Sequence, residues 1–569
     1  MGEGWAGPIP PLLRRIYAAR GAHDEAAARP RLAQLLAPDS LTGIDTATGI
    51  LADAIAANQR ILVVGDFDCD GATACAVMVR GLRMLGAQQV EHAVPNRMVH
   101  GYGLSPALVA DLAPRAPDLL VTVDHGIACH AGIAAARALG WTVLVTDHHL
   151  PGAVLPAAHG IVNPNLAGDR FPSKALAGVG VAFYVLLALR ARLRRGQAPV
   201  DSAAFGGGLT ALLDLVAVGT IADLVPLDAN NRAMVSAGLR QIRSGRGCAG
   251  LQALIAVAGR DVGRLTATDI GFAVAPRLNA AGRLEDMALG IDCLLTDDAG
   301  VAHAHAATLN AINVERRRVQ QSMVDEADLA VALPRATSRP RAAAVCLFDA
   351  GWHPGVIGLV ASKLKERLHR PVVAFAPAEP GGTLLRGSAR SIAGFHMRDA
   401  LAAVDVAHPG LIDRFGGHAM AAGLSLAVGN LTRFEAALQA HAEAVLDPAL
   451  LRAELESDGE LEPHEFDHVH ALHLREGGPW GQGFPEPLFD GHFDVLDWRI
   501  VAERHLKLSL RVVGAEAPPL PAIQFGGWRE RAPGARVHIA YRLVPDDYRG
   551  GNAVQLIIEH CVPVGLAND

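Results

Sequence analysis

The stretch ILVVGDFDCDG (61–71) is a run of apolar, strand-favouring residues that ends on three carboxylates. Two later stretches repeat this pattern, LLVTVDHGI (119–127) and TVLVTDHHLPG (142–152). Helical segments rich in Ala and Leu lie between them, and this spacing predicts a doubly wound parallel α/β sheet. Ligands bind such sheets at the carboxyl ends of the strands. The polar residues that we expect at these ends are Asp66, Asp68, Asp70, Asp124, Asp147, His148 and His149.

The composition indicates a globular protein of several domains. A chain of 569 residues is too long for one hydrophobic core. Half of its residues are hydrophobic and 19% are charged, which argues against a disordered chain. The net charge of −7 gives no overall sign of nucleic-acid binding, unless the basic residues gather on one face of the protein.

The cysteines and the apolar segments favour a cytoplasmic protein. Seven scattered cysteines never form a CxxC pair, which argues against a disulfide framework or a zinc ribbon. The first residues lack the pattern of a signal peptide. The longest apolar run, 175–189, is too short to cross a membrane and predicts a buried helix. We therefore expect no membrane contact.

The pattern along the chain predicts five regions. Residues 1–50 form an extension to which no chemistry is assigned, and the sequence leaves open whether PIPPLLRRIYAARG is a helix that packs on the catalytic domain. The first α/β domain spans 51–298 and carries the acidic motifs. A long connecting helix follows at 299–335, where Gly and Pro are nearly absent. A second α/β domain spans 336–447, and short alternating strands at 448–569 predict a β-barrel or sandwich.

The acidic motifs predict a metal site. Side chains two residues apart in a strand point the same way, so Asp66, Asp68 and Asp70 converge if the strand persists through them. A turn that opens at Gly71 would instead leave at least the last two acids at the tip. Carboxylates this close cannot all ionise without a cation. Oxygen ligands with one or two imidazoles favour Mn²⁺ or Mg²⁺.

With three further residues, the candidate ligands are enough to hold two metal ions. Asp124, His148 and the later Asp223, in LLDLVAVGTIADLVPLDANNR (212–232), supply enough donors for two ions that activate water against a phosphodiester. The alternative is that each acid caps a helix, which is ordinary for an Asp between a strand and a helix. The combination of all three motifs favours the metal site.

Longer motifs resemble a known family. GDFDCDG (65–71), TVDHGI (122–127), VTDHHLPG (145–152) and GTIADLVPL (219–227) resemble the motifs of the DHH phosphoesterases. The resemblance continues through PNR and HGYGLS (95–105), GSARSI (387–392), RFGGHAMAAGLSL (414–426) and GPWGQGFPEPLFDGHF (478–493). Within the family, these longer motifs are similar to those of bacterial exonucleases specific for single-stranded DNA. The resemblance implies a DHH catalytic domain, a DHH-associated domain and a C-terminal OB-fold barrel.

The resemblance also implies residue roles. The implied metal ligands are Asp68, Asp70, Asp124, His148 and Asp223. His149 would contact the scissile phosphate or stabilise its charge, while Asp66 and Asp147 would orient ligands. One departure follows Asp124, where the family more often has Asn or Cys and this chain has His125. His125 adds a ligand or a phosphate contact, or is a polar neighbour; we favour the last.

Further residues are implied to bind DNA. Matches to phosphate-binding positions of the family are Arg97, Arg277, Ser388 and Arg390. His353 and His418 lie in Gly-rich loops that enter helices, where backbone N–H groups can bind phosphate. Candidate groups on the β-barrel are Arg504, Lys507, Arg542, Tyr548 and Arg549, although an exposed charged strand face also accounts for each of them.

The implied function is that of a cytoplasmic, monomeric exonuclease that depends on two Mn²⁺ or Mg²⁺ ions. It would degrade single-stranded DNA from the 5′ end to nucleoside 5′-monophosphates during recombination and repair, with single-strand-binding protein and a helicase as partners. Two alternatives are a DHH phosphodiesterase for short oligonucleotides or cyclic dinucleotides, and a DNA-binding scaffold without catalysis. The extra β domain argues against the first, and the complete set of acids argues against the second.

Overall fold

The computed structural model describes the whole chain except residues 1–4, 6–8, 98, 196–207, 333–341 and 565–569. It divides into two compact units. Unit 1 comprises Met1–Gly282, Asp286–Asn310 and Leu455–Asp569, and unit 2 comprises Arg283–Glu285 and Ala311–Glu454. All seven cysteines have free thiols, in agreement with the sequence analysis.

Unit 1 contains the predicted doubly wound parallel sheet. Its strand order is β2-β1-β3-β4-β5, and every pairing is parallel. The strands are β1 (Ile61–Val64), β2 (Val90–Ala93), β3 (Leu119–Val123), β4 (Thr142–Thr146) and β5 (Gly160–Val162). This arrangement confirms the predicted fold class for the first domain.

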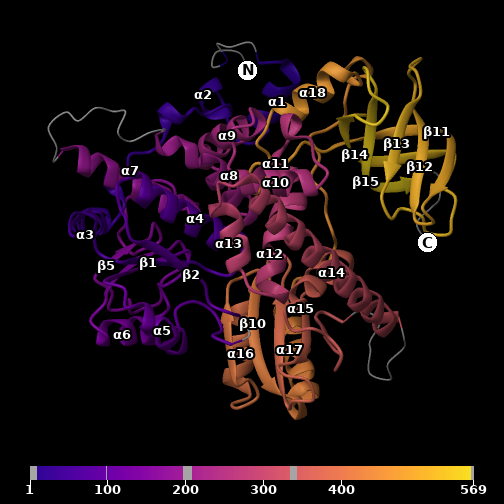
Figure 1. Cartoon of the computed structure of the whole chain (residues 1–569). Coiled ribbons are helices and arrows are strands. Elements are labelled where there is room, and N and C mark those ends of the chain that lie inside the picture. Colours follow the sequence, from indigo (N-terminus) through magenta and orange to yellow (C-terminus); the bar gives the residue numbers. More distant parts are fainter. Residues whose placement is uncertain (1–4, 6–8, 98, 196–207, 333–341, 565–569) are drawn as a thin grey trace. The chain divides into compact units, whose positions relative to one another are not determined.

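Helices cover both faces of this sheet, as the uninterrupted apolar strands require. Alternate residues of β1 enter different cores: Ile61 and Val63 join one cluster, and Leu62 and Val64 join another. One face packs on α3 (Ile44–Ala56), α4 (Cys69–Met84) and α7 (Gly178–Arg195). The other packs on α5 (Pro106–Leu112) and α6 (His130–Ala138), which lie together in Figure 1.

A helical layer completes the catalytic part of unit 1. Its helices are α8 (Leu213–Ala222), α9 (Ala229–Arg243), α10 (Ala249–Val257), α11 (Ala267–Asp269), α12 (Ala275–Leu284) and α13 (Ala288–Leu295). A π-helical turn, η6 (Ile270–Val274), joins α11 to α12. Within the described residues, we find no helix with the length and hydropathy needed to span a bilayer.

The predicted long helix is α14 (Ala299–Ala332). Its residues up to Asn310 belong to unit 1, and its residues from Ala311 belong to unit 2. The prediction extended this helix to 335, and positions 333–335 lie outside the described residues.

Unit 2 is the second α/β domain. Its sheet has the order β6-β7-β8-β10-β9, in which β6 and β7 are parallel and the other neighbours are antiparallel. The strands are β6 (Val345–Phe348), β7 (Val372–Pro377), β8 (Leu384–Arg390), β9 (Arg414–Gly417) and β10 (Ala421–Ala427). The helices are α15 (Ile357–Leu368), α16 (Met397–Ala407) and α17 (Leu431–Val445).

The C-terminal part of unit 1 is a closed barrel of order β11-β12-β13-β15-β14. Its strands are β11 (Phe489–Val501), β12 (His505–Val512), β13 (Leu520–Gln524), β14 (Arg536–Pro545) and β15 (Val554–Pro563), and α18 (His468–Glu476) precedes them. Closure of the barrel settles the choice that the sequence left between a barrel and a sandwich.

The extension forms α1 (Pro11–Ala19) and the short α2 (Glu25–Ala28). The buried Tyr17 hydroxyl donates a hydrogen bond to the carbonyl of Gly477 at 2.7 Å. Its ring stacks near Phe484, and Arg20 forms an ion pair with Asp458 at 2.7 Å. These contacts place the helix against the segment that leads into the barrel.

Candidate metal centre

The predicted acids follow neighbouring strands at one edge of the sheet. Asp66 follows β1, Asp124 follows β3, and Asp147 follows β4. In a sheet of order β2-β1-β3-β4-β5, successive strands are added on opposite sides of β1, so the strand order reverses between β1 and β3. Ligands of such sheets bind in the crevice at this switch point. Asp223 joins the group from the C-terminal end of α8.

The first motif is helical at its end, because Asp68 caps α4. The Asp68 carboxylate accepts a hydrogen bond from the N–H of Gly71 at 3.0 Å, and the helix begins at Cys69. Of the two alternatives that the sequence left open, neither is observed: the strand ends at Val64, and Gly71 lies in the first turn of α4. A Cβ at Gly71 would lie 2.6 Å from the Cα of Asp66, so only glycine fits this first helical turn.

The start of α7 holds Asp70 in place. Its carboxylate accepts hydrogen bonds from the N–H groups of Gly178 at 2.6 Å and Val179 at 3.0 Å. Free N–H groups at a helix start stabilise a negative charge. A Cβ at Gly178 would lie 2.4 Å from Oδ1 of Asp124, so the same glycine lets α7 approach both acids.

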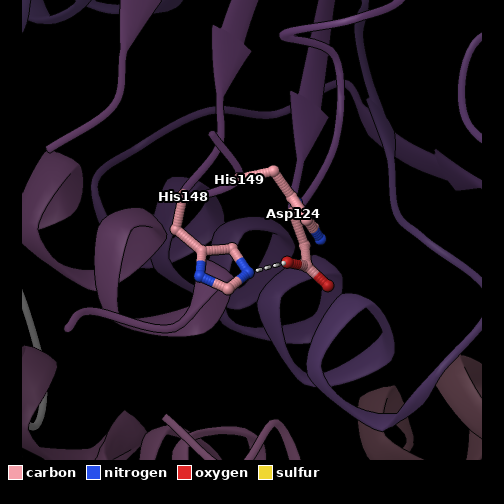
Figure 2. A group of neighbouring side chains, drawn as sticks. All are labelled: Asp124, His148 and His149. Atoms are coloured by element: carbon pink, nitrogen blue, oxygen red, sulfur yellow. Dashed lines mark ion pairs between the residues drawn. The ribbon is translucent and has the colours of Figure 1, made fainter. Parts of the chain in front are cut away.

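Asp124 and His148 meet at the centre of the site (Figure 2). Nε2 of His148 lies 3.1 Å from Oδ1 of Asp124 and 3.5 Å from Oδ2 of Asp223. Asp124 has a φ of 64°, a left-handed conformation that is uncommon outside glycine. Its buried Oδ1 makes no hydrogen bond with the described residues. Such an oxygen suits a cation ligand.

His149 and Asp147 form a separate pair. Nδ1 of His149 lies 2.8 Å from Oδ1 of Asp147, and the same oxygen accepts the backbone N–H of His149. The second oxygen of Asp147 accepts the N–H of Ile127 at 2.9 Å. Nε2 of His149 lies 3.5 Å from the hydroxyl of Tyr102. Asp147 therefore fixes the orientation of the imidazole.

The charges of this pair support each other. Burial by itself would raise the pKa of Asp147, but the hydrogen bond and charge of His149 outweigh burial and bring it to about 2. Burial would lower the pKa of His149, and the hydrogen bond to Asp147 raises it to about 9. His149 is therefore an imidazolium at neutral pH, with its proton on Nδ1 facing Asp147 and Nε2–H toward the site.

The side chains offer overlapping sets of metal ligands. Among the described residues, three sets have ligand atoms within 4.8 Å of one another: Asp124, His148 and His149; Asp70, His148 and Asp223; Asp66, Asp68 and Asp124. Asp124 belongs to two sets, and so does His148. Carboxylates with one or two imidazoles fit Mn²⁺ or Mg²⁺, as the sequence analysis expected.

The electrostatics of the acids also fit a cation. Burial, followed by the charge of Asp68, raises the pKa of Asp70 to about 7. Burial and the neighbouring carboxylates hold the pKa values of Asp66, Asp124 and Asp223 well above the ordinary range. A divalent cation would offset this repulsion and allow the acids to ionise together.

His125 is a buried polar neighbour of the site. Its Nε2 lies 3.1 Å from the carbonyl oxygen of Val64, at the end of β1. Burial lowers the pKa of His125 to about 4, so the ring is neutral at neutral pH. It belongs to none of the ligand sets found among the described residues.

The loop with Arg97 and Tyr102 lines the site. The Arg97 guanidinium lies 5.0 Å from the centre of the Phe67 ring, and that ring packs edge-on against Tyr102. Sequence reasoning missed Phe67 and Tyr102. The sequence did contain a signal for Tyr102, because it stands between two glycines, Gly101 and Gly103. In the structure both glycines have positive φ. Such a loop projects an aromatic ring without strain in its neighbours.

Arg277 lies in α12. Its Nε donates to Oδ1 of Asn310 at 3.0 Å, and its guanidinium also donates to the carbonyl of Ala273. The side chain is buried, so its contacts tie α12 to α14 and to the π-helical turn. Its role in binding DNA stays a prediction.

In unit 2, Ser388 and Arg390 lie together on β8. The guanidinium of Arg390 donates to the hydroxyls of Ser388 at 3.1 Å and Ser362 at 3.2 Å. A Cβ at Gly358 would lie 2.9 Å from both Arg390 and Ser388, so the first turn of α15 rests against the pair. Backbone N–H groups at a helix start and an arginine together favour an anion.

The two loop histidines of unit 2 differ. Nδ1 of His353 accepts the N–H of Gly355 at 3.1 Å, and burial lowers the pKa of His353. His418 is exposed after β9, and its backbone N–H donates to the carbonyl of Ala421 at 2.8 Å. Their roles in phosphate binding stay predictions.

The candidate groups on the barrel are of two kinds. Arg542 forms ion pairs with Glu486 and Glu559, and Arg549 lies 3.7 Å from Asp546. These contacts are of the kind expected from a charged strand face. Tyr548 and Arg504 are exposed, and Lys507 is half-buried on β12.

Three family models match the chain. The N-terminal domain of the DHH family matches residues 60–220, the DHHA1 domain matches 341–444, and the RecJ OB domain matches 457–560. They follow the order of the sheet with the acids, the second α/β domain and the closed barrel.

Relatives that align over nearly their whole length share the same protein name. The single-stranded-DNA-specific exonuclease RecJ of Dickeya dadantii is 48% identical and covers 98% of this chain and 96% of its own length. RecJ of Escherichia coli has the same identity and coverage. Among solved structures, RecJ of Thermus thermophilus in complex with Mn²⁺ has a TM-score of 0.80 and 32% identity, over 97% of this chain and 76% of that chain. Its Mg²⁺ complex has a TM-score of 0.74 and 30% identity, over 98% and 76%.

Proposed function

Because this chain belongs to the RecJ family of single-stranded-DNA-specific exonucleases, we propose that it hydrolyses single-stranded DNA from the 5′ end with two divalent ions. The observation that carries this proposal is the convergence of five carboxylates and two imidazoles at the switch point of the sheet. The five carboxylates are Asp66, Asp68, Asp70, Asp124 and Asp223.

Three overlapping ligand sets support a pair of ions. We assign Asp68, Asp70, Asp124, His148 and Asp223 as the residues that would hold them. Asp124 belongs to two of the three sets. When bound, Mn²⁺ or Mg²⁺ lowers the pKa of a water molecule and offsets the charge of the phosphodiester. The Asp66 carboxylate accepts the N–H of Phe67 at 2.8 Å, which positions the loop after β1.

His149 supplies positive charge to the substrate phosphate. Asp147 holds its imidazolium form at neutral pH and orients the ring through Nδ1. Nε2–H is then a fixed donor for a phosphate oxygen whose negative charge grows during hydrolysis. The Tyr102 hydroxyl lies 3.5 Å from Nε2 and comes from the loop that also carries Arg97.

Ser388 and Arg390 would bind the 5′-terminal phosphate. Their hydroxyl and guanidinium, with the start of α15, make a compact set of anion-binding groups. Recognition of that end is the proposed origin of the 5′→3′ direction. The monomeric state, the cytoplasmic location, and single-strand-binding protein and a helicase as partners remain predictions from the resemblance. The full-length relatives do not favour a small-substrate phosphodiesterase or a scaffold.

The test is release of label from single-stranded DNA marked at either end, with Mn²⁺ or with chelator. We expect early mononucleotide release from the 5′ label only, which Asp124→Asn abolishes. The matched control is Asp53→Asn, an exposed acid on α3, which should keep full activity. Early release from the 3′ label would refute the polarity. No release from any single strand by the wild type would refute the function.

A second comparison tests the end-binding groups. Wild type should favour a 5′-phosphate over a 5′-hydroxyl substrate, and Arg390→Gln should remove this preference. An unchanged preference in Arg390→Gln would exclude the assigned role of Arg390.

A further inference from the structure

We infer that a pocket beside Asp223 binds an unpaired nucleobase of the substrate strand, with Phe272 and Leu224 as its apolar walls. The inference rests on the proposed function and adds a specific contact to it. The pocket has a volume of about 260 Å³ and lies wholly within unit 1. Its lining comes from the end of α8, from the turn η6 and from the segment between α18 and the barrel.

Leu224 directly follows the metal-site acid. It has a φ of 60°, and 70% of its side chain is exposed. A left-handed conformation is costly for a branched residue that is not glycine, and such costs are concentrated at functional sites. Leu224 therefore presents apolar surface one residue away from Asp223.

Phe272 lies in the π-helical turn η6 and is 82% exposed. π-Helical turns are rare in proteins as a whole, but those that occur are often found at functional sites. A Cβ at the neighbouring Gly271 would lie 3.6 Å from Cγ2 of Ile221, so the turn packs against α8. The turn that carries Phe272 therefore rests against the helix that ends at Asp223.

The opposite wall is firmly attached to the same helices. The N–H of Leu227 donates to the carbonyl of Gln482 at 2.7 Å. The Arg232 guanidinium lies 3.9 Å from the centre of the Phe484 ring. Trp480 and Gln482 line the pocket from this segment. The walls are therefore preformed, which lowers the cost of binding a flat ligand.

The polar groups of the pocket favour a neutral ligand over a phosphate. Arg542 lines it, but the charge of Arg542 is balanced by Glu486 and Glu559. Gln482 lines the pocket, and its side-chain amide can bond to a base edge. Unpaired bases stack on aromatic rings, whereas bases in a duplex have their faces covered.

The experiment compares Phe272→Ala with wild type on an ordinary oligonucleotide and on a fully abasic one. With the ordinary strand we expect KM to rise roughly 5- to 150-fold at nearly constant kcat, the range expected for loss of one stacked base. With the abasic strand, the two proteins should have equal KM values. Phe272→Trp should restore the wild-type KM, and Leu139→Ala, an apolar residue 52% exposed at the end of α6, should not change it.

Two results would overturn the inference. One is an unchanged KM of Phe272→Ala on the ordinary strand. The other is an equal rise on the abasic strand, which would assign the effect to the backbone of the DNA. Oligonucleotide binding in EDTA, followed by fluorescence anisotropy, separates this inference from the proposed function. If wild type hydrolyses nothing, the function fails, and a weaker complex with Phe272→Ala would still support the pocket.

Discussion

At the scale of single residues, the centre combines buried acids whose pKa values are raised by burial with one histidine whose pKa is raised by Asp147. The acids could be predicted from sequence, because parallel strands bring their carboxyl ends together. The left-handed backbone of Asp124 and the contact between Tyr102 and His149 could not. Both depend on how loops from separate strands pack, and no local pattern encodes that.

Substitution of Asp147 should shift the pH dependence of hydrolysis. Asp147→Asn keeps the size of the side chain but removes the charge that raises the pKa of His149 to about 9. Burial then dominates, so this pKa should fall to about 6.5 or lower, the ordinary value. Activity that needs the imidazolium should therefore decline at a lower pH in the variant. The measurement is kcat with Mg²⁺ from pH 6 to 10. A decline at the same pH in both proteins would contradict the assigned role of His149.

At the scale of elements, the site is where the ends of three helices meet the end of the sheet. The starts of α4 and α7 and the end of α8 bring Asp68, Asp70 and Asp223 to the strands. The helices themselves were predictable from composition. The start of α4 was not, because an Asp after a strand is read equally well as a strand residue, a turn residue or a cap. In the structure Asp68 is a helix cap, and the next acid, Asp70, lies in the first turn of α4 and accepts hydrogen bonds from the start of α7.

Gly178→Ala tests the close approach of α7. The new Cβ would lie 2.4 Å from Oδ1 of Asp124, so either the helix or the acid must move. We expect Mn²⁺ affinity to fall roughly tenfold or more, as for other changes to groups that position metal ligands. Isothermal titration calorimetry measures this affinity.

The matched control is Gly49→Ala in α3, where the nearest atom to the new Cβ is Nη2 of Arg192 at 3.6 Å. This change should leave the affinity intact and stabilise the helix by roughly 0.5–1 kcal/mol. Equal affinities in the two variants would show that α7 does not constrain the acids.

At the scale of the whole molecule, metal binding and stability should be linked through pH. The pKa of Asp70 is raised to about 7, so the metal-free folded state holds more protons than the unfolded state between about pH 4 and 7. Its stability therefore falls as the pH rises through this window, and the raised pKa values of Asp66, Asp124 and Asp223 act in the same direction. His149 adds a further loss between pH 6.5 and about 9. Asp147, with a pKa of about 2, contributes a constant term above pH 5.

Bound cations should reverse this trend, because they need ionised carboxylates. We expect the difference in Tm between Mn²⁺-loaded and EDTA-treated protein to grow from pH 5 to pH 8. Differential scanning fluorimetry measures both values on the same preparation. A difference that is constant or shrinks with pH would argue against these acids as the principal ligands.

The order of sheets, long helix and barrel could be predicted from sequence, because each region keeps its own hydrophobic period. The partner of α1 could not be predicted. Its apolar face fits many surfaces, and the pairing with Gly477 and Phe484 spans most of the chain.

That pairing has a consequence during synthesis. The hydroxyl of Tyr17 and its acceptor are separated by 460 residues. At a ribosomal rate of about 5–20 residues per second, α1 waits roughly 20–90 s for its partner to leave the ribosome. For that time its apolar residues Leu12, Leu13 and Ile16 lack the surface that buries them in the finished protein. The nascent chain thus presents a hydrophobic segment that a chaperone can hold until translation is nearly complete.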